Sequence, residues 1–153
     1  MPNPTPPPDL PTLLLAAAAD VTDALRAGVA AAGFADVRPA HGFAFARMAA
    51  GGATVGEIAA HLGVTKQAAS QLVEDLVLRG YAQRNPHPHD ARARLITLTD
   101  RGRAAARATE AAAAEFTARW VAGLGEQRAS GLREALAGMV TPRRGAARAA
   151  VSR

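Results

Sequence analysis

The chain has 153 residues, which suits one domain with a single hydrophobic core. It contains no cysteine, so disulfides, thiolate zinc ligands and a thiol nucleophile are excluded. Its 18 Lys and Arg residues outnumber its 13 Asp and Glu residues, and the formal charge of +5 favours a polyanionic partner such as nucleic acid or anionic lipid.

The first segments are a proline-rich lead at residues 1–9 and a helix at about residues 10–33. The prolines favour an extended, disordered lead, and no basic stretch marks a signal peptide. Apolar residues then recur at spacings of three and four, which predicts one face of an amphipathic helix. Asp20, Asp23 and Arg26 interrupt this apolar stretch before it reaches the length of a membrane span. We therefore expect a cytoplasmic protein that does not enter a membrane.

A short second helix is expected to begin at Pro39 and to end before Gly51. Proline suits the first turn of a helix because that turn has no intrahelical partner for its N–H groups. Phe43, Phe45 and Met48 are expected to form the apolar side of this helix.

Residues 54–80 predict two helices joined by a tight turn, which is the spacing of a helix-turn-helix. Thr54 and Glu57 form a capping box at the first helix, Gly63 suits the turn, and Thr65 is the expected N-cap of the second helix. The second helix presents polar side chains that suit contacts with bases and phosphates in the major groove. These side chains are Thr65, Lys66, Gln67, Ser70 and Gln71. Taken alone, the segment fits an ordinary solvent-exposed helical hairpin equally well.

Residues 81–84 and 94–98 predict two short β-strands, with residues 85–91 as a long tip rich in turn formers. A helix-turn-helix followed by such a hairpin is a winged helix, and this wing carries Arg84, Arg92 and Arg94. Guanidinium groups on a wing can enter a narrow minor groove or pair with phosphates. The alternative is a set of solvated charges on an exposed turn.

Asp90 is the one acid in the wing, and a carboxylate at that place would repel DNA. We therefore expect Asp90 to fix either an arginine or the turn backbone by a local hydrogen bond.

Two further helices are expected at about residues 100–122, capped by Thr99 or Asp100, and 126–140, stopping before Pro142. Together with the helix at 10–33 they carry more apolar surface than a small winged helix can cover, which favours a homodimer. A three-helix appendage without a partner is the alternative. Residues 141–153 form an expected basic, flexible tail. Its arginines are Arg143, Arg144, Arg148 and Arg153, with no acid, so most of the net charge lies there.

The fold class expected from these patterns is mainly α with a small β-hairpin wing. One domain spans residues 10–140, with the winged helix at about residues 38–98 between N- and C-terminal dimerisation helices.

From Thr54 through Tyr81, followed by Asp90-Ala-Arg92 and residues 95–102, the sequence resembles the MarR family of bacterial transcription regulators. The resemblance implies a homodimer of winged-helix subunits with a recognition helix in the major groove. By position it places Thr65 to Gln71 on that helix and assigns Arg92 to the minor groove. Ala91 departs from the family pattern, since many relatives have another basic residue there, and the absence of cysteine sets the chain apart from the peroxide-sensing branch.

The same resemblance implies a small, often aromatic or phenolic, effector bound between the dimerisation and DNA-binding parts. His41 and Phe45 lie where such a ligand would bind, although helix packing or hydrogen bonding at the helix end would equally explain His41. His87 and His89 lie in the wing loop, and His61 lies on a different helix from His41 with no acid at ligand spacing. No Cys/His/carboxylate cluster results, so no metal site is expected.

No P-loop, GxSxG or dinucleotide-binding motif is present, so we expect neither an enzyme nor a cofactor. The main hypothesis is a homodimeric, sequence-specific DNA-binding regulator, expected to be a ligand-responsive repressor at a pseudo-palindromic operator. The alternative is a winged helix that serves as a protein-interaction module without binding DNA.

Overall fold

The structure is a computed structural model that describes the backbone of residues 8–151 and the side chains of residues 8–139. The described residues form a helical molecule with one two-stranded antiparallel hairpin, consistent with the expected fold class. The elements are α1 (Leu10–Ala31), α2 (Pro39–Ala49), α3 (Val55–Leu62), α4 (Lys66–Leu78), β1 (Ala82–His87), β2 (Asp90–Leu98), α5 (Asp100–Leu124) and α6 (Glu126–Val151). Most of the proline-rich lead lies outside the described residues.

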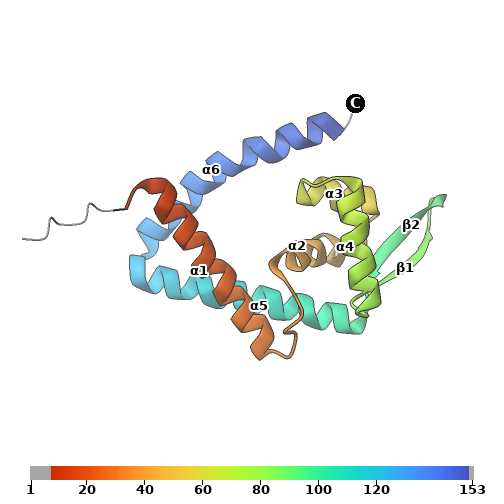
Figure 1. Ribbon diagram of the computed structural model, residues 1–153, viewed down its shortest axis with the longest axis horizontal. Coiled ribbons are helices and arrows are strands. Elements are labelled where there is room, and N and C mark those ends of the chain that lie inside the picture. Colours follow the sequence, from red (N-terminus) through yellow and green to blue (C-terminus); the bar gives the residue numbers. More distant parts are fainter. Residues whose placement is uncertain (1–7, 152–153) are drawn as a thin grey trace, which may run out of the picture.

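The long helix α5 connects the two parts of the molecule (Figure 1). At one end α1 packs along α5 and α6 turns back from it, while at the other end α2, α3, α4 and the hairpin gather. Within the described residues, none of the helices is both long and apolar enough to cross a membrane.

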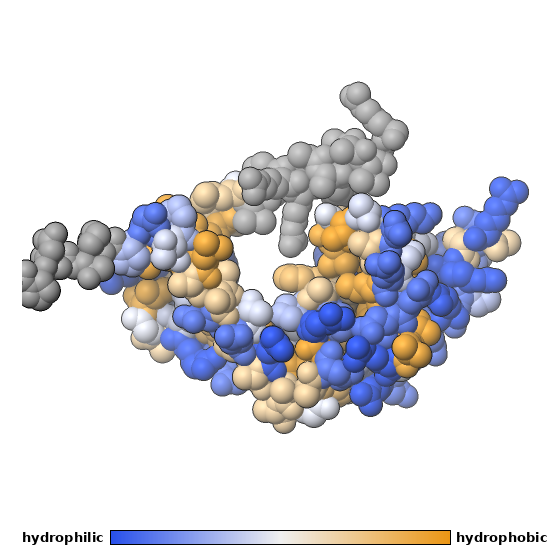
Figure 2. All heavy atoms as spheres, in the orientation of Figure 1, coloured by the Kyte–Doolittle hydropathy of each residue, from blue (hydrophilic) through white to orange (hydrophobic). Residues whose placement is uncertain are grey.

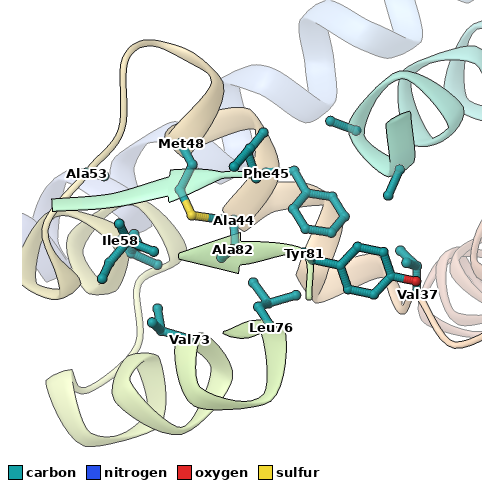
Figure 3. Packing of buried hydrophobic residues seen from close by; sticks show 14 of the residues in the cluster. Val37, Ala44, Phe45, Met48, Ala53, Ile58, Val73, Leu76, Tyr81 and Ala82 are labelled. Carbon is teal, nitrogen blue, oxygen red and sulfur yellow. The ribbon is translucent and has the colours of Figure 1, made fainter. Parts of the chain in front are cut away.

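The hydrophobic core lies mainly between α2, α3, α4 and the hairpin. Figure 3 shows Phe45, Met48, Ile58, Leu76 and Tyr81 pointing into this shared interior. Each of these side chains is almost fully buried. Since side chains from α2, α3, α4 and the start of the hairpin meet in a single cluster, these elements pack as one body.

The predicted helix-turn-helix is present, and its caps explain where the helices begin. The Thr54 hydroxyl accepts a hydrogen bond from the Glu57 amide at 3.2 Å, and Glu57 accepts one from the Thr54 amide at 2.8 Å. Gly63 ends α3 with a φ of 68°, a left-handed conformation that glycine adopts without strain. The Thr65 hydroxyl then accepts from the Ala68 amide at 3.1 Å and starts α4.

The hairpin is longer than predicted, and the expectation of a tip spanning residues 85–91 is wrong. Pairing continues from Ala82 opposite Leu98 to His87 opposite Asp90, with a shift in register after Pro86. Each strand of a two-stranded ribbon has one edge without a partner strand. Pro86, which lacks a backbone N–H group, can therefore lie within β1. A further bridge joins Ala53, in the α2–α3 linker, to Ile96 of β2 and anchors the wing to the helices.

The structure corrects two other expectations, which concern the end of α6 and the position of Phe43 on α2. Helix α6 runs through Pro142 to Val151 instead of stopping before the proline, so the backbone of residues 141–151, predicted as a flexible tail, is helical. The proline removes one backbone hydrogen bond of the helix without ending it. Phe43 is 52% exposed and lies off the buried side of α2, which Phe45 and Met48 share with His41 and Ala44.

Candidate nucleic-acid interface

The expected recognition helix α4 has one buried face and one free polar face. Ala69, Val73 and Leu76 lie in the core, which fixes the rotation of the helix about its axis. The opposite face presents Lys66 and Gln71 to solvent. Of the remaining predicted contacts, Thr65 and Gln67 are exposed, and Ser70 is half-buried. Four of the five predicted side chains are thus accessible to a large ligand, and Thr65 also caps the helix.

The wing places Arg92 and Arg94 on exposed positions of β2. The Asp90 carboxylate accepts a hydrogen bond from the backbone N–H of Arg92 at 2.9 Å. Of the two roles expected for Asp90, the structure therefore shows the one in which it fixes the turn backbone. The Arg92 guanidinium is exposed and forms no ion pair with any described side chain.

Arg84 differs from the other two wing arginines because it faces the recognition helix. It pairs across the hairpin with Ile96, and paired residues share one face, so Arg84 lies on the side of the sheet that carries Ile96 into the core. Its guanidinium comes within 3.9 Å of the Glu74 carboxylate on α4. Glu74 partly neutralises Arg84, which leaves Arg92 and Arg94 as the wing's more available cations.

His41 is buried at the beginning of α2, where both ring nitrogens face protein groups. Nδ1 accepts a hydrogen bond from the backbone N–H of Arg38 at 3.2 Å, and Nε2 lies 3.5 Å from the Asp75 carboxylate of α4. Burial, together with the nearby Arg38 charge, lowers the pKa of His41 below its ordinary value. These contacts fit the alternative expected for His41, which is hydrogen bonding at the end of the helix and not ligand binding.

A cavity of about 210 Å³ opens between α1, α2 and α5. Its walls are largely apolar, and Phe45 lies among them whereas His41 does not. The lining residues are Leu25, Arg26, Val29, Val37, Arg38, Pro39, Gly42, Phe43, Phe45, Ala46, Ala106, Thr109, Glu110 and Ala113. The position between the α1–α5 pair and the winged helix is the one expected for an effector, and only one of the two predicted ligand residues reaches it.

A second and larger apolar hollow, of about 820 Å³, lies between α1, α5 and α6. Figure 2 shows apolar side chains gathered on the concave side of the molecule over α1. The residues lining the hollow include Leu14, Val21, Trp120, Leu132 and Leu136. Leu14, Leu132 and Leu136 remain between 36% and 41% exposed, so the described part of the chain leaves this surface partly uncovered.

Sequence reasoning missed a polar network that ties the recognition helix to the rest of the molecule. Asp75 of α4 accepts a hydrogen bond from Arg79 at 2.8 Å and lies 3.4 Å from the Arg38 guanidinium. Arg79 also reaches Asp36, which accepts a 2.6 Å hydrogen bond from the Tyr81 hydroxyl. The Arg79 hydrogen bond holds the pKa of Asp75 below its ordinary value. Three of these hydrogen bonds, Arg38 to Asp75, Arg79 to Asp36 and Tyr81 to Asp36, join residues that are 37 to 45 positions apart in the sequence. No local sequence motif indicates such pairs.

The chain is similar to a known protein family and to several solved structures. The model of the MarR family matches residues 38–93, from the start of α2 through most of the wing. No curated protein matches the sequence. The structure of the transcriptional repressor CouR bound to a 23-mer DNA duplex is similar, with 28% identity, a TM-score of 0.73, and coverage of 86% of this chain and 92% of that chain.

Two more solved structures have the same architecture. A "probable transcriptional regulator" from Pseudomonas aeruginosa is 26% identical with a TM-score of 0.72, and the match covers 86% of this chain and 96% of that chain. CouR from Rhodococcus jostii RHA1 bound to p-coumaroyl-CoA is 23% identical with a TM-score of 0.71, over 88% of this chain and 93% of that chain. At 23% identity, the likeness to this CouR structure shows a common fold alone.

Proposed function

We propose that this chain, whose residues 38–93 match the model of the MarR family, is a DNA-binding transcription regulator of that family and acts as a homodimer. The observation that carries the proposal is the common placement of α4 and the hairpin at one end of the molecule (Figure 1). Exposed Lys66, Gln67 and Gln71 on α4 suit bases and phosphates of the major groove, and exposed Arg92 on the wing suits the adjacent minor groove.

The homodimer is supported by the apolar hollow between α1, α5 and α6. A second copy would cover the exposed leucines there, and a two-fold arrangement places two recognition helices about 34 Å apart, one turn of DNA. Such symmetry calls for a pseudo-palindromic operator. Residues 141–153 carry four arginines and no acid, and we assign this positive charge to nonspecific phosphate attraction.

The cavity between α1, α2 and α5 supports regulation by a small ligand. It is smaller than the about 300–1,000 Å³ typical of drug-sized ligands, which suits a single-ring molecule. The similar CouR structures include one with p-coumaroyl-CoA and one with DNA, and CouR is described as a repressor. We assign this chain the same general behaviour, that of a cytoplasmic repressor without catalytic activity whose DNA affinity a ligand lowers.

The experiment that tests the function is selection of duplexes from a genomic pool, followed by salt-titrated binding of the selected duplex. A regulator of this class binds the selected duplex far more tightly than random DNA, and the logarithm of its affinity falls linearly with the logarithm of salt concentration. A chain that prefers no duplex over random DNA would instead fit the alternative, a winged helix that binds a protein.

A further inference from the structure

The exposed face of the recognition helix α4 carries an acid. Gln67, Gln71 and Glu74 follow one another at spacings of four and three residues, so they lie along one stripe of the helix. All three side chains are exposed. A helix that enters a groove of DNA brings such a stripe close to phosphates, and a carboxylate without a cation beside it would repel them.

The other acid of α4 is neutralised by residues of the helices. Asp75 is half-buried and forms ion pairs with Arg79 at 2.8 Å and with Arg38 at 3.4 Å. Glu74 forms no ion pair with either arginine. The one cation within α4, Lys66, lies eight residues before Glu74, which is about 12 Å along the helix axis. A cation for Glu74 must therefore come from outside α4.

The wing supplies that cation from the strand β1, which contacts α4 (Figure 1). The Arg84 guanidinium lies 3.9 Å from the Glu74 carboxylate, and the pairing of Arg84 with Ile96 directs its side chain to the helical side of the hairpin. Arg94 alternates with Ile96 and so lies on the same side, but it forms no ion pair with a described side chain. Of the wing arginines, Arg84 is thus the one that meets an acid of α4 in the part of the chain that the structure describes.

We infer that Arg84 is a positioning residue for DNA binding, which neutralises Glu74 on the recognition helix instead of contacting phosphate itself. The inference rests on the proposed function, because it concerns how α4 approaches DNA. It also changes the role expected for Arg84, which was a direct DNA contact.

The pair should affect DNA affinity and not folding. The two side chains are 43% and 65% exposed, and ion pairs at such positions add little to stability. Together the two charges cancel, so the pair neither attracts nor repels phosphates at a distance. Without Arg84, the Glu74 carboxylate faces the phosphates alone.

The test is a double-mutant cycle on the full chain, read as affinity for the selected duplex at one fixed, low salt concentration. Arg84→Gln should weaken binding by about tenfold, or about threefold for each protomer of the homodimer. Glu74→Gln alone should tighten binding by about threefold or less, because Arg84 already neutralises that carboxylate. With both changes present, affinity should return to within about twofold of the unmodified chain. Unchanged midpoints of thermal unfolding establish that all variants are folded.

Arg94→Gln is the matched control, since Arg94 is an exposed arginine on the same side of the hairpin. Adding Glu74→Gln should improve its binding by about threefold or less, against about tenfold for Arg84→Gln. A double variant that binds as weakly as Arg84→Gln would show that Arg84 contacts DNA itself. Equal improvement of both single variants would show a general effect of charge, and weaker binding by Glu74→Gln would show that Glu74 itself contacts a base.

Each of those three results overturns the inference, as does full affinity of Arg84→Gln. In each case, preference of the unmodified chain for the selected duplex over random DNA would leave the proposed function standing. Loss of that preference in the unmodified chain would overturn the proposed function and the inference together.

Discussion

The Tyr81 hydroxyl donates a 2.6 Å hydrogen bond to the carboxylate of Asp36, across 45 residues of sequence. Arg101 of α5 lies 4.7 Å from the centre of the same ring and donates to the same hydroxyl at 3.2 Å. Tyr81 is fully buried where α4 ends and the wing begins. One side chain thus joins the α1–α2 loop, the wing and the long helix, so it fixes the recognition helix relative to α5.

Tyr81→Phe should lower the free energy of unfolding by about 1–2 kcal/mol, because the Asp36 carboxylate loses one of its two donors and keeps only Arg79, while the ring still fills its place. Urea denaturation followed by circular dichroism measures this. Phe34→Leu, at a half-buried ring 6.3 Å away, controls for loss of aromatic packing. Equal stability of Tyr81→Phe and the unmodified chain would show that the hydrogen bond contributes nothing.

Gly102→Ala should destabilise the fold by about 1–3 kcal/mol. A Cβ at this position would collide with the backbone carbonyl of Tyr81, which cannot rotate away as a side chain could. Gly123→Ala is the matched control, since Gly123 lies in the same helix with open space around it. The midpoints of thermal unfolding of the two variants give the comparison, and a normal midpoint for Gly102→Ala would contradict the packing of α5 against the backbone of Tyr81.

Arg92→Ala should weaken binding to the selected duplex and reduce the slope of log affinity against log salt by about one. Thermal stability should stay unchanged because the Arg92 side chain is exposed. Arg107→Ala, at an exposed arginine on α5 near the base of the wing and not at its tip, should leave both quantities unaltered. If the two variants bind DNA equally well, the wing does not contact it in the way we propose.

Leu132→Asp should convert a dimer to a monomer and abolish tight DNA binding. Leu132 is 36% exposed and lines the apolar hollow, so the charge disturbs a partner's surface more than the chain's own core. Leu78→Asp, at a leucine that is 87% exposed outside the hollow, should remain dimeric. Sedimentation velocity distinguishes the species, and a dimeric Leu132→Asp would place the interface elsewhere.

Stability should decline in mild acid because of His41. Its folded pKa lies below the ordinary value of 6.5, so the unfolded chain takes up the proton first as the pH falls below about 6.5. The free energy of unfolding should then drop by at most about 1.4 kcal/mol per pH unit. Asp75 and Asp36 act the same way only at lower pH, below their ordinary value of 3.8.

Urea titrations between about pH 7 and about pH 5 measure that decline. His41→Asn retains a side-chain acceptor for the Arg38 amide but does not titrate, so its stability should vary less over this interval. An equal decline in both proteins would assign the effect to other groups.

The parts of the fold that follow from local rules were predictable from sequence. Thr54 with Glu57, Gly63 and Thr65 fix the ends of α3 and α4 through hydrogen bonds within a few residues, so the helix-turn-helix could be placed. The exposed face of α4 followed from the spacing of its apolar residues.

What could not be predicted depends on contacts between distant segments. Pro86 looks like part of a turn unless one knows that its strand has a free edge. The positions of Arg38 beside Asp75 and Asp36 beside Tyr81 depend on how α2, α4 and the α1–α2 loop pack together. His41 was placed near a ligand for the same reason, because its burial against α4 is a tertiary property.

Lys66, the exposed first residue of α4, is the only lysine in the chain. An amine-reactive reagent therefore has a single side-chain target, besides the α-amino group, and that target lies on the surface we assign to DNA. The natural sequence thus carries its own reporter position: a dye or a mass tag at Lys66 would mark the recognition helix without any engineered residue, and the rate of labelling would register whether that surface is occupied.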